Sequence, residues 1–350
     1  MVKRTIRMSP AEYVNESGIL KRLPFILEEH GIRNPVILTD ETVLSIIREY
    51  LPHGFWDEYC IEIFGGSCTF EEIGRLTEKF QSFDALIAFG GGQLIDTAKV
   101  VANRLKITII NSQTVPSNCA AITTKSIIYS QEHEKVDNVR HKKAVDIVLL
   151  EPDILIKAPK AYILSGIGDT LAKFYEIRRR ITDDKLGAVS SQIGRYFIEL
   201  CRREMLSIRQ LDNLSQQELT NLFDVIFLVA ASVDGISDND GRSVLAHGFY
   251  NAYVKIKPDY TKTHGEAVAL GSLLQMIVEG DKSLEYRKEI EAYHRLIGLP
   301  LTLKDLGISS DSEIDALATY ITRKTDSRVQ SVFPDLDVEV VRTALEEIRG

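Results

Sequence analysis

The sequence predicts an α/β domain with a parallel sheet at residues 1–157, followed by an all-α domain at residues 158–350. Three observations lead to this division. Short apolar runs alternate with helical stretches over the first 150 residues, and long amphipathic stretches follow Glu151-Pro152. In addition, 44% of the 350 residues are apolar, which is enough to bury sizeable cores. No flexible linker lies at the border, so we expect the two halves to pack closely around a cleft.

Strands and helices alternate in the first half. Apolar runs predict strands at 35–39, 61–64, 85–89 and 107–110, and helical periodicity predicts helices at 41–50, 70–82 and 94–104. This alternation is typical of a parallel sheet with right-handed connections. Two apolar runs, 126–129 and 144–149, flank a charged loop and predict a hairpin that extends the sheet at the domain edge. Amphipathic helices are expected in the second half at 160–179, 185–206, 215–234, 264–279, 282–296 and 338–348.

Composition and charge exclude several classes of function. The formal net charge of -8 disfavours nucleic acid and anionic membranes as partners. The N-terminus lacks the apolar core of a signal peptide, and no apolar stretch approaches the roughly 20 residues of a membrane span. We therefore expect a cytoplasmic protein with a small-molecule substrate. Four cysteines without framework spacing predict reduced thiols: Cys60, Cys68, Cys119 and Cys201.

Three glycines, Gly90, Gly91 and Gly92, follow the predicted strand at 85–89 and precede a predicted helix. Glycines let backbone N–H groups approach an anion, and a helix N-terminus presents unpaired amides and a positive dipole end. The turn therefore fits a phosphate site at the carboxyl end of a parallel strand. It matches neither the Walker A nor the GxGxxG fingerprint, and a plain tight turn explains it equally well.

One carboxylate and two imidazoles in the second half form a candidate metal site. Asp169 stands at a predicted helix start, His247 lies in an apolar stretch, and His264 opens the sequence HGEA. This O/N set suits zinc or ferrous iron, and three protein ligands leave a position for a substrate oxygen or water. Each residue also has a structural interpretation: Asp169 and His264 as helix caps, and His247 as a core histidine.

Four motifs occur in order along nearly the whole chain: GGGQLIDTAK at 90–99, GIGDTLAKFYE at 166–176, AHGFYN at 246–251 and HGEAVALG at 264–271. Together they resemble the group III, iron-containing alcohol dehydrogenases, and the glycerol dehydrogenases among them. The resemblance implies a Rossmann-like dinucleotide domain and a helical domain, which is the dehydroquinate synthase-like fold.

The same resemblance implies an activity. An NAD(P)-dependent oxidoreductase would interconvert a small polar alcohol and its carbonyl compound, with one zinc or iron ion held by Asp169, His247 and His264. Relatives commonly assemble, which implies a homo-oligomer. The alternatives are a catalytically weak or inactive nucleotide-binding relative, a glycerol-1-phosphate dehydrogenase-like enzyme, and a synthase like the dehydroquinate enzymes.

Further residues acquire cofactor roles through the resemblance. Backbone amides from Gly91 to Gln93 would hold the pyrophosphate, and Thr114 and Ser117 would lie near the nicotinamide and its ribose. Asp96 and Lys99 would face the cofactor or the cleft, unless they form a solvated ion pair. Asp40 ends a predicted strand where relatives bind ribose, so its carboxylate favours NAD over NADP, and helix capping is its structural alternative.

Three residues bear on the substrate. Cys119 replaces an aspartate with which glycerol dehydrogenases contact the polyol, and Cys119-Ala120-Ala121 resembles the hydroxycarboxylate dehydrogenase branch, which reduces 2-oxo acids with NADPH. That cofactor conflicts with the expectation from Asp40. Lys125 could pair with a substrate carboxylate or be an ordinary surface lysine. Tyr250 stands where relatives commonly have a histidine proton relay, and its phenol is a poorer relay near neutral pH.

Overall fold

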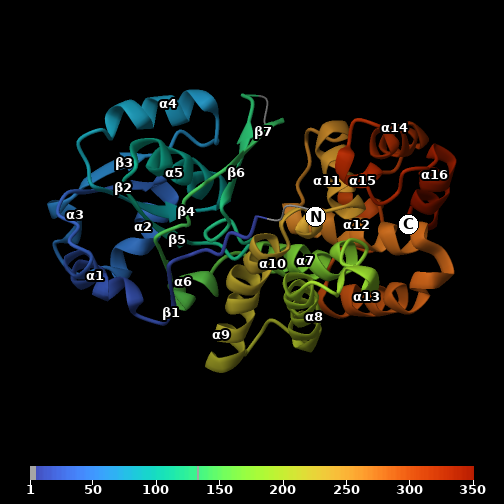
Figure 1. The fold of residues 1–350 in the computed structure, drawn as a ribbon, viewed down its shortest axis with the longest axis horizontal. Coiled ribbons are helices and arrows are strands. Elements are labelled where there is room, and N and C mark those ends of the chain that lie inside the picture. The colour runs from blue at the N-terminus through green and yellow to red at the C-terminus, as the bar shows by residue number, and fades with distance from the viewer. Residues whose placement is uncertain (1–4, 132–133) are drawn as a thin grey trace. The chain divides into compact units, whose positions relative to one another are not determined.

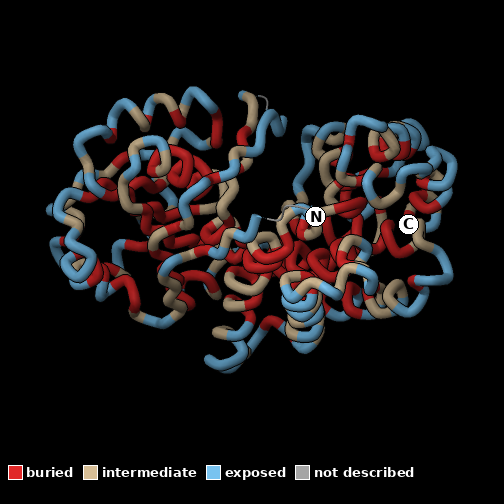
Figure 2. Tube along the Cα trace, in the orientation of Figure 1, coloured by how far each residue is buried: buried red, intermediate tan, exposed pale blue. Residues whose placement is uncertain are grey.

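The computed structural model describes residues 5–131 and 134–350. By its contacts the chain divides into two compact units. The sheet unit contains residues 7–159 and 216–235, whereas the helical unit contains residues 160–215 and 236–350 together with residues 5–6. The division expected at residue 157 does not include the return of 216–235 to the sheet unit. Within each unit, buried residues line the interior and exposed ones occupy the outer helices (Figure 2).

A parallel sheet forms the centre of the sheet unit, with the strand order β1-β8-β5-β4-β2-β3 (Figure 1). The strands are β1 Glu12–Asn15, β2 Pro35–Thr39, β3 Cys60–Ile63, β4 Ala85–Gly90, β5 Thr108–Gln113 and β8 Ile147–Leu150. From β2 the chain moves outward to β3 and then crosses back to β4, which pairs with the other side of β2. The strand order therefore reverses between β2 and β4, and ligands of such sheets bind where the order reverses, at the carboxyl ends of the strands.

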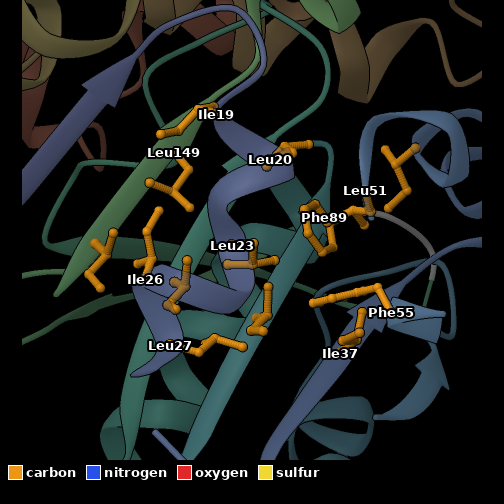
Figure 3. Packing of buried hydrophobic residues seen from close by; sticks show 14 of the residues in the cluster. Ile19, Leu20, Leu23, Ile26, Leu27, Ile37, Leu51, Phe55, Phe89 and Leu149 are labelled. Carbon is orange, nitrogen blue, oxygen red and sulfur yellow. The ribbon is translucent and has the colours of Figure 1, made fainter. Parts of the chain in front are cut away.

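Helices cover both faces of this sheet. On one face, α1 Leu23–Glu29, α2 Glu41–Ile47 and α3 Phe55–Glu58 pack on side chains of the central strands. Leu23, Ile26 and Leu27 of α1 face the sheet in Figure 3. Full burial of a side chain of this size contributes about 1.5–3 kcal/mol, so this face is a principal source of stability. The opposite face carries α4 Phe70–Lys79 and α5 Gly92–Leu105, as right-handed crossovers require.

The hairpin prediction is wrong in its second strand. β6 Lys125–Tyr129 pairs antiparallel with β7 Lys135–Arg140, whereas β8 lies in the main sheet between β1 and β5. All four residues of β8 are buried, as expected for an inner parallel strand with both faces covered. The sequence of β7 is charged and its residues are mostly exposed, so it lacks the apolar pattern that identified the other strands. The edge strand β1 was not expected from the sequence either.

The segment 216–241 forms a continuous helical run from α9 Gln216–Asp224 through a π-helical turn, Val225–Val229, to α10 Ala230–Ser237 and a last 3-10 turn. In length and composition it could cross a membrane, which differs from the expectation that no stretch approaches a span. Core helices of globular proteins share this length and composition. Here Asp224 accepts a hydrogen bond of 2.7 Å from the Tyr13 hydroxyl, and more than half of the apolar window is buried.

The helical unit contains α7 Lys160–Ile177, α8 Val189–Ser207, α11 Leu245–Ile256, α12 His264–Glu279, α13 Leu284–Ile297, α14 Asp311–Thr322, α15 Ser327–Gln330 and α16 Val338–Glu347. Two glycines allow α7 and α12 to approach closely. A Cβ on Gly265 would lie 1.7 Å from the Ser165 carbonyl oxygen, and one on Gly168 would lie 2.3 Å from the Gly265 carbonyl oxygen. Only glycine fits at both positions.

Two buried histidines make the fold sensitive to acid. Burial and the nearby Lys99 lower the pKa of His141 to about 4, and burial lowers the pKa of His294 to about 4. Because both folded-state values lie below the ordinary value near 6.5, the unfolded chain binds more protons in this range. Stability is therefore full above about pH 6.5 and falls as the pH drops toward 4.

We predict that His294→Asn, whose amide can still donate to the Pro300 carbonyl, reduces the loss of stability on acidification. Each buried histidine contributes on the order of 1 kcal/mol to the difference between pH 7.5 and pH 5.5. Urea unfolding at both pH values measures this difference in the free energy of unfolding. His53 is exposed, so His53→Asn should show the wild-type difference. An unchanged pH difference in His294→Asn would contradict the prediction.

Candidate metal and dinucleotide sites

Asp169, His247 and His264 converge in the helical unit. One ligand atom of each lies within 4.8 Å of the others, and the Asp169 Oδ1 atom is 3.4 Å from His247 Nε2 and 3.3 Å from His264 Nε2. Ligand atoms about 2.1 Å from a tetrahedral ion are roughly 3.4 Å apart. The two distances from Asp169 therefore match those between ligands of one divalent ion. The predicted ligand set is brought together by residues almost a hundred positions apart in sequence.

Each ligand has a fixed place on its helix. Asp169 lies in the middle of α7, so the expectation that it begins a helix is wrong, and a capping role is excluded. His264 is the first residue of α12, where Thr263 and Glu266 form a capping box instead. The Gly265 amide donates to the Ser165 hydroxyl of α7 at 2.9 Å, which ties the start of α12 to the helix that carries Asp169.

Glu176 orients His247, the second candidate ligand, and it is not among the site residues predicted from the sequence. Its Oε2 atom lies 2.7 Å from His247 Nδ1, and its Oε1 atom accepts from the amides of Val244 and His247 at 2.7 and 3.1 Å. A proton on Nδ1 leaves Nε2 free for a metal, and carboxylates commonly fix metal-binding histidines in this way. Asp169 and Glu176 lie two helical turns apart, a spacing that could have identified the pair.

Electrostatics in this cluster favours positive charge. Burial by itself raises the pKa of Asp169, but hydrogen bonds from His247 and His264 outweigh it and hold that pKa well below its usual range. Burial acts to raise the pKa of Glu176 as well, but the contact with His247 outweighs burial, so the pKa of Glu176 is lowered overall. Burial lowers the pKa of His247, yet the two carboxylates raise it overall. Both acids are thus ionised around a point where a cation can sit.

Tyr250 belongs to this cluster as well. The centre of its ring lies 4.2 Å from the centre of the His264 ring, and the two rings are nearly perpendicular. Tyr250 also packs on Ala172, Ala246 and Val268. Burial raises the pKa of its hydroxyl, so the phenol stays protonated near neutral pH. The contact limits the orientations open to His264.

The three glycines lie where β4 passes into α5, in the sheet unit. Gly91 caps α5 without any side-chain hydrogen bond, so amides of the first turn have no capping side chain. A Cβ on Gly90 would lie 2.7 Å from Leu94 Cδ1, and one on Gly92 would lie 3.1 Å from Asn118 Nδ2. A side chain at either position would press on the neighbouring Leu94 or Asn118 side chain, and the uncapped amides fit an anion.

Thr114 lies beside this turn. Gly90 pairs with Gln113 in the sheet, and the Thr114 amide donates to the Gly90 carbonyl oxygen at 3.0 Å. The hydroxyl oxygen of Thr114 is buried and has no hydrogen-bond partner in the described chain. An unsatisfied buried hydroxyl next to uncapped amides fits a polar ligand. Ser117 follows in the same loop and is buried too.

Asp40 caps α2 at the carboxyl end of β2. Its Oδ1 atom accepts from the Val43 amide at 2.9 Å, so the structural alternative considered for this residue is present. β2 neighbours β4, and Asp40 and the glycine turn therefore lie on either side of the reversal in strand order. The position is compatible with a ribose role, which stays a prediction.

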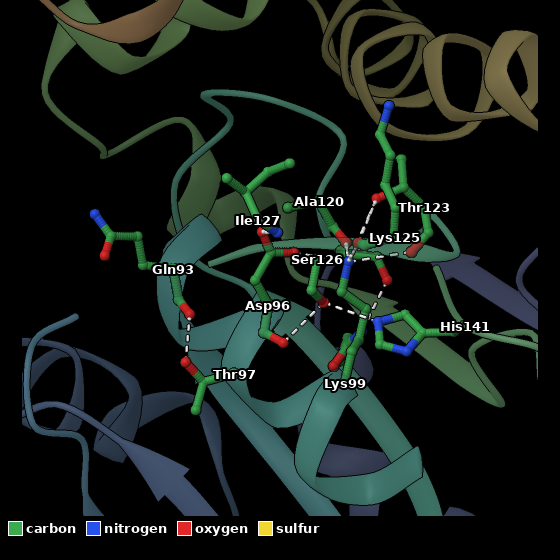
Figure 4. Close-up of polar contacts among 12 residues, drawn as sticks. Gln93, Asp96, Thr97, Lys99, Ala120, Thr123, Lys125, Ser126, Ile127 and His141 are labelled. Carbon is green, nitrogen blue, oxygen red and sulfur yellow. Dashed lines mark hydrogen bonds and ion pairs between the residues drawn. The ribbon is translucent and has the colours of Figure 1, made fainter. Parts of the chain in front are cut away.

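Asp96 and Lys99 form a buried ion pair, not a solvated one. Their residues are 8% and 1% exposed, and Lys99 Nζ lies 2.8 Å from Asp96 Oδ1 (Figure 4). The ammonium also reaches carbonyl oxygens of residues 120–125 instead of standing free for a ligand. Gln93 accepts from the Ser67 hydroxyl and the Cys68 amide, both at 3.1 Å, through its side-chain oxygen.

The remaining predicted site residues lie in the same unit. Cys119 is buried within the loop that follows β5. Lys125 begins β6, and its ammonium forms an ion pair with Asp234 of α10. This pairing gives Lys125 a partner within the protein, which a substrate carboxylate would have to displace.

Comparison with known proteins supports the resemblance. Residues 10–152 match the family described as iron-containing alcohol dehydrogenase, which is less than half of the chain. Glycerol dehydrogenase of Thermotoga maritima is 28% identical over 320 residues, covering 89% of this chain and 88% of that protein. Hydroxycarboxylate dehydrogenase A of Escherichia coli is 27% identical over 353 residues, covering 98% of this chain and 97% of that protein.

A solved structure shows the same fold. Glycerol dehydrogenase from Schizosaccharomyces pombe has a TM-score of 0.83 at 24% identity, covering 99% of this chain and 91% of that one. The relationship to the iron-containing alcohol dehydrogenases predicted from the four motifs is confirmed, and with it the α/β and helical fold and an enzymatic, oxidoreductase function.

Glu176→Gln tests how His247 is held. A glutamine that keeps its oxygen on the two backbone amides turns its NH2 group toward His247 Nδ1, which forces the proton to Nε2 and blocks that ligand atom. We expect metal affinity to fall about 10- to 100-fold, measured by competition with a chelator.

A matched control is Glu289→Gln, because Glu289 is a partly buried carboxylate of the same unit that binds Tyr175 and Arg202. Its metal affinity should stay at the wild-type level. Wild-type affinity in Glu176→Gln would show that the carboxylate does not fix the histidine.

Proposed function

We propose that this chain is a metal-dependent oxidoreductase that uses NAD to interconvert a small polar alcohol and its carbonyl compound. The convergence of Asp169, His247 and His264 carries the proposal, because these ligand types at this spacing fit a divalent ion with a position left for substrate. The relatives named glycerol dehydrogenase and hydroxycarboxylate dehydrogenase support it. The homo-oligomer implied by the resemblance stays a prediction.

The residues divide the work between the two units. Asp169, His247 and His264 would hold zinc or iron, which polarises an alcohol or carbonyl oxygen and so favours hydride transfer. Glu176 keeps the Nε2 atom of His247 available as a ligand. In the sheet unit, uncapped amides after Gly91 would bind the pyrophosphate of a dinucleotide, the source or acceptor of the hydride.

A 2-oxo acid is the second candidate for the carbonyl substrate. Cys119 stands where glycerol dehydrogenases carry an aspartate, so an acceptor for polyol hydroxyls and a group that repels anions are both missing. This substitution favours a substrate with a carboxylate over glycerol. Tyr250, whose buried phenol keeps its proton near neutral pH, favours slow turnover or proton transfer through water or a ribose hydroxyl. An inactive nucleotide-binding relative is the outcome that a lack of turnover would support.

Loss of one ligand should remove the metal. We predict that Asp169→Ala and His264→Ala each lose most bound metal and activity while far-ultraviolet circular dichroism stays unchanged. Metal analysis of the dialysed proteins checks this, with the exposed His53→Ala as control. Stoichiometric metal in both ligand variants would overturn the assignment.

Oxidation of NADH and NADPH with 2-oxo acids, dihydroxyacetone and simple aldehydes identifies the substrate class. Product analysis distinguishes a synthase, which consumes no net cofactor.

Asp40→Asn separates charge from capping. Asparagine caps helices as well as aspartate does, so α2 should persist while the charge that would repel a 2′-phosphate is lost. We expect the preference for NADH over NADPH, as a ratio of kcat/KM values, to fall about tenfold. Asp337 caps α16 by accepting from the Glu339 amide, and Asp337→Asn should leave the ratio unchanged. A wild-type preference for NADPH would refute the reasoning from Asp40.

A further inference from the structure

We propose that Lys99 is a positioning residue: its buried ammonium fixes the loop 114–124, and through this loop it sets the affinity of the sheet unit for the dinucleotide. The inference rests on the proposed function, since it concerns the cofactor site named there. It assigns Lys99 a role other than direct contact with the cofactor.

The contacts of Lys99 converge on the end of one loop. Its Nζ atom donates to the carbonyl oxygens of Ala120 at 2.7 Å, Thr123 at 3.1 Å and Lys125 at 2.6 Å, and lies 3.3 Å from the Thr123 hydroxyl (Figure 4). With Asp96, five oxygen atoms surround an ammonium that has three protons. The ammonium therefore has no proton left for a further ligand, and its hydrogen bonds hold the loop in place.

The loop needs such a donor. Residues 114–124 form no helix or strand, so their buried carbonyl groups lack the partners that regular structure provides. Gln113 and Asn111 of β5 donate to the carbonyl oxygens of Val115, Asn118 and Ala121. Lys99 of α5 donates to those of Ala120 and Thr123. The loop is thus fixed between β5 and the helix that begins at the glycine turn.

Asp96 makes this arrangement possible inside the protein. Its Oδ1 atom neutralises the ammonium, and its Oδ2 atom accepts from the Ile127 amide at 2.9 Å, just beyond the loop. A buried charge is tolerated when it is paired and hydrogen-bonded, and removing one partner leaves the other uncompensated. Asp96 and Lys99 therefore act on the loop as a pair.

A movement of the loop 114–124 would change the packing at the glycine turn of the proposed cofactor site. Asn118 lies close enough to Gly92 that a single methyl group on the glycine would be 3.1 Å from its Nδ2 atom. Thr114, at the start of the loop, hydrogen-bonds to Gly90 and presents its unsatisfied hydroxyl beside the same turn. Because interiors are closely packed, a small shift of the loop changes the space at the glycine turn.

The experiment compares three variants. Lys99→Met removes the donor, Asp96→Asn/Lys99→Met removes both charges and so avoids an unpaired buried carboxylate, and Lys143→Met is the control. Lys143 forms an i,i+3 ion pair of 2.7 Å with Asp146, as Lys99 does with Asp96 at the same spacing, but its side chain is 48% exposed. Hydrogen exchange of residues 114–124, the dissociation constant of NADH and the metal content are measured for each.

We expect faster hydrogen exchange of residues 114–124 in both Lys99 variants. The dissociation constant for NADH should rise about tenfold, while the metal content stays at the wild-type level. The control should match wild type in all three. Unchanged exchange in the double variant, or faster exchange with unchanged NADH binding, would overturn the proposal. If the wild type itself binds no dinucleotide, the proposed function fails and this inference with it, whereas loss of metal in the Lys99 variants would show general damage instead of loop positioning.

Discussion

The close contact between α7 and α12 is the constraint on which the geometry of the candidate metal site depends. Gly168 and Gly265 bring the two backbones so near that any side chain at either position would clash. Asp169 follows the first glycine and His264 precedes the second, so the same contact that packs the helices sets the distance between the two ligands. α11 joins the cluster in a similar way, since a Cβ on Gly271 of α12 would lie 2.6 Å from the Ala246 carbonyl oxygen. His247 is the next residue. Small residues here serve the geometry of the site as much as the packing of the core.

In the sheet unit, the corresponding constraint is that backbone N–H and C=O groups at the strand ends need hydrogen-bond partners. A parallel strand stops pairing at its carboxyl end, and the chain that follows must find other partners for its N–H and C=O groups. Asp40 satisfies one amide after β2, while Gln113 and Lys99 satisfy carbonyl groups after β5. After β4 the amides of the first turn of α5 receive no side-chain cap. That exception stands at the reversal of strand order, where an anionic ligand is the expected partner.

Sequence patterns predicted the parts of the structure whose signal is local. Periodicity predicts buried strands such as β2 and β4 and amphipathic helices such as α12, and the motifs contain all three candidate metal ligands. Contacts that depend on the fold gave no such signal. β7 has no signal in the sequence, because an exposed charged strand lacks apolar alternation. The two glycines before Asp169 resemble a helix break, and only the facing helix shows why they lie within α7. For Asp96 and Lys99 the sequence predicts side chains that face the cofactor or the cleft, with a solvated ion pair as the alternative, because burial by a distant loop cannot be inferred from i,i+3 spacing.

Charge decides whether the cluster in the helical unit is a metal site or a structural ion-pair network. Asp169 and Glu176 are both buried carboxylates, and an isolated buried charge is costly unless it is neutralised. Lys173 supplies one positive charge, which helps to lower the pKa of Asp169. Two protonated histidines could supply the rest, but the centres of their rings lie 5.3 Å apart and both Nε2 atoms are directed at one oxygen, Asp169 Oδ1. Two like charges would then repel across a single acceptor. One divalent ion with neutral histidines balances the two carboxylates without that repulsion, and it uses the Nδ1 proton that Glu176 already holds on His247. The arrangement is therefore better suited to a metal ion than to two protons.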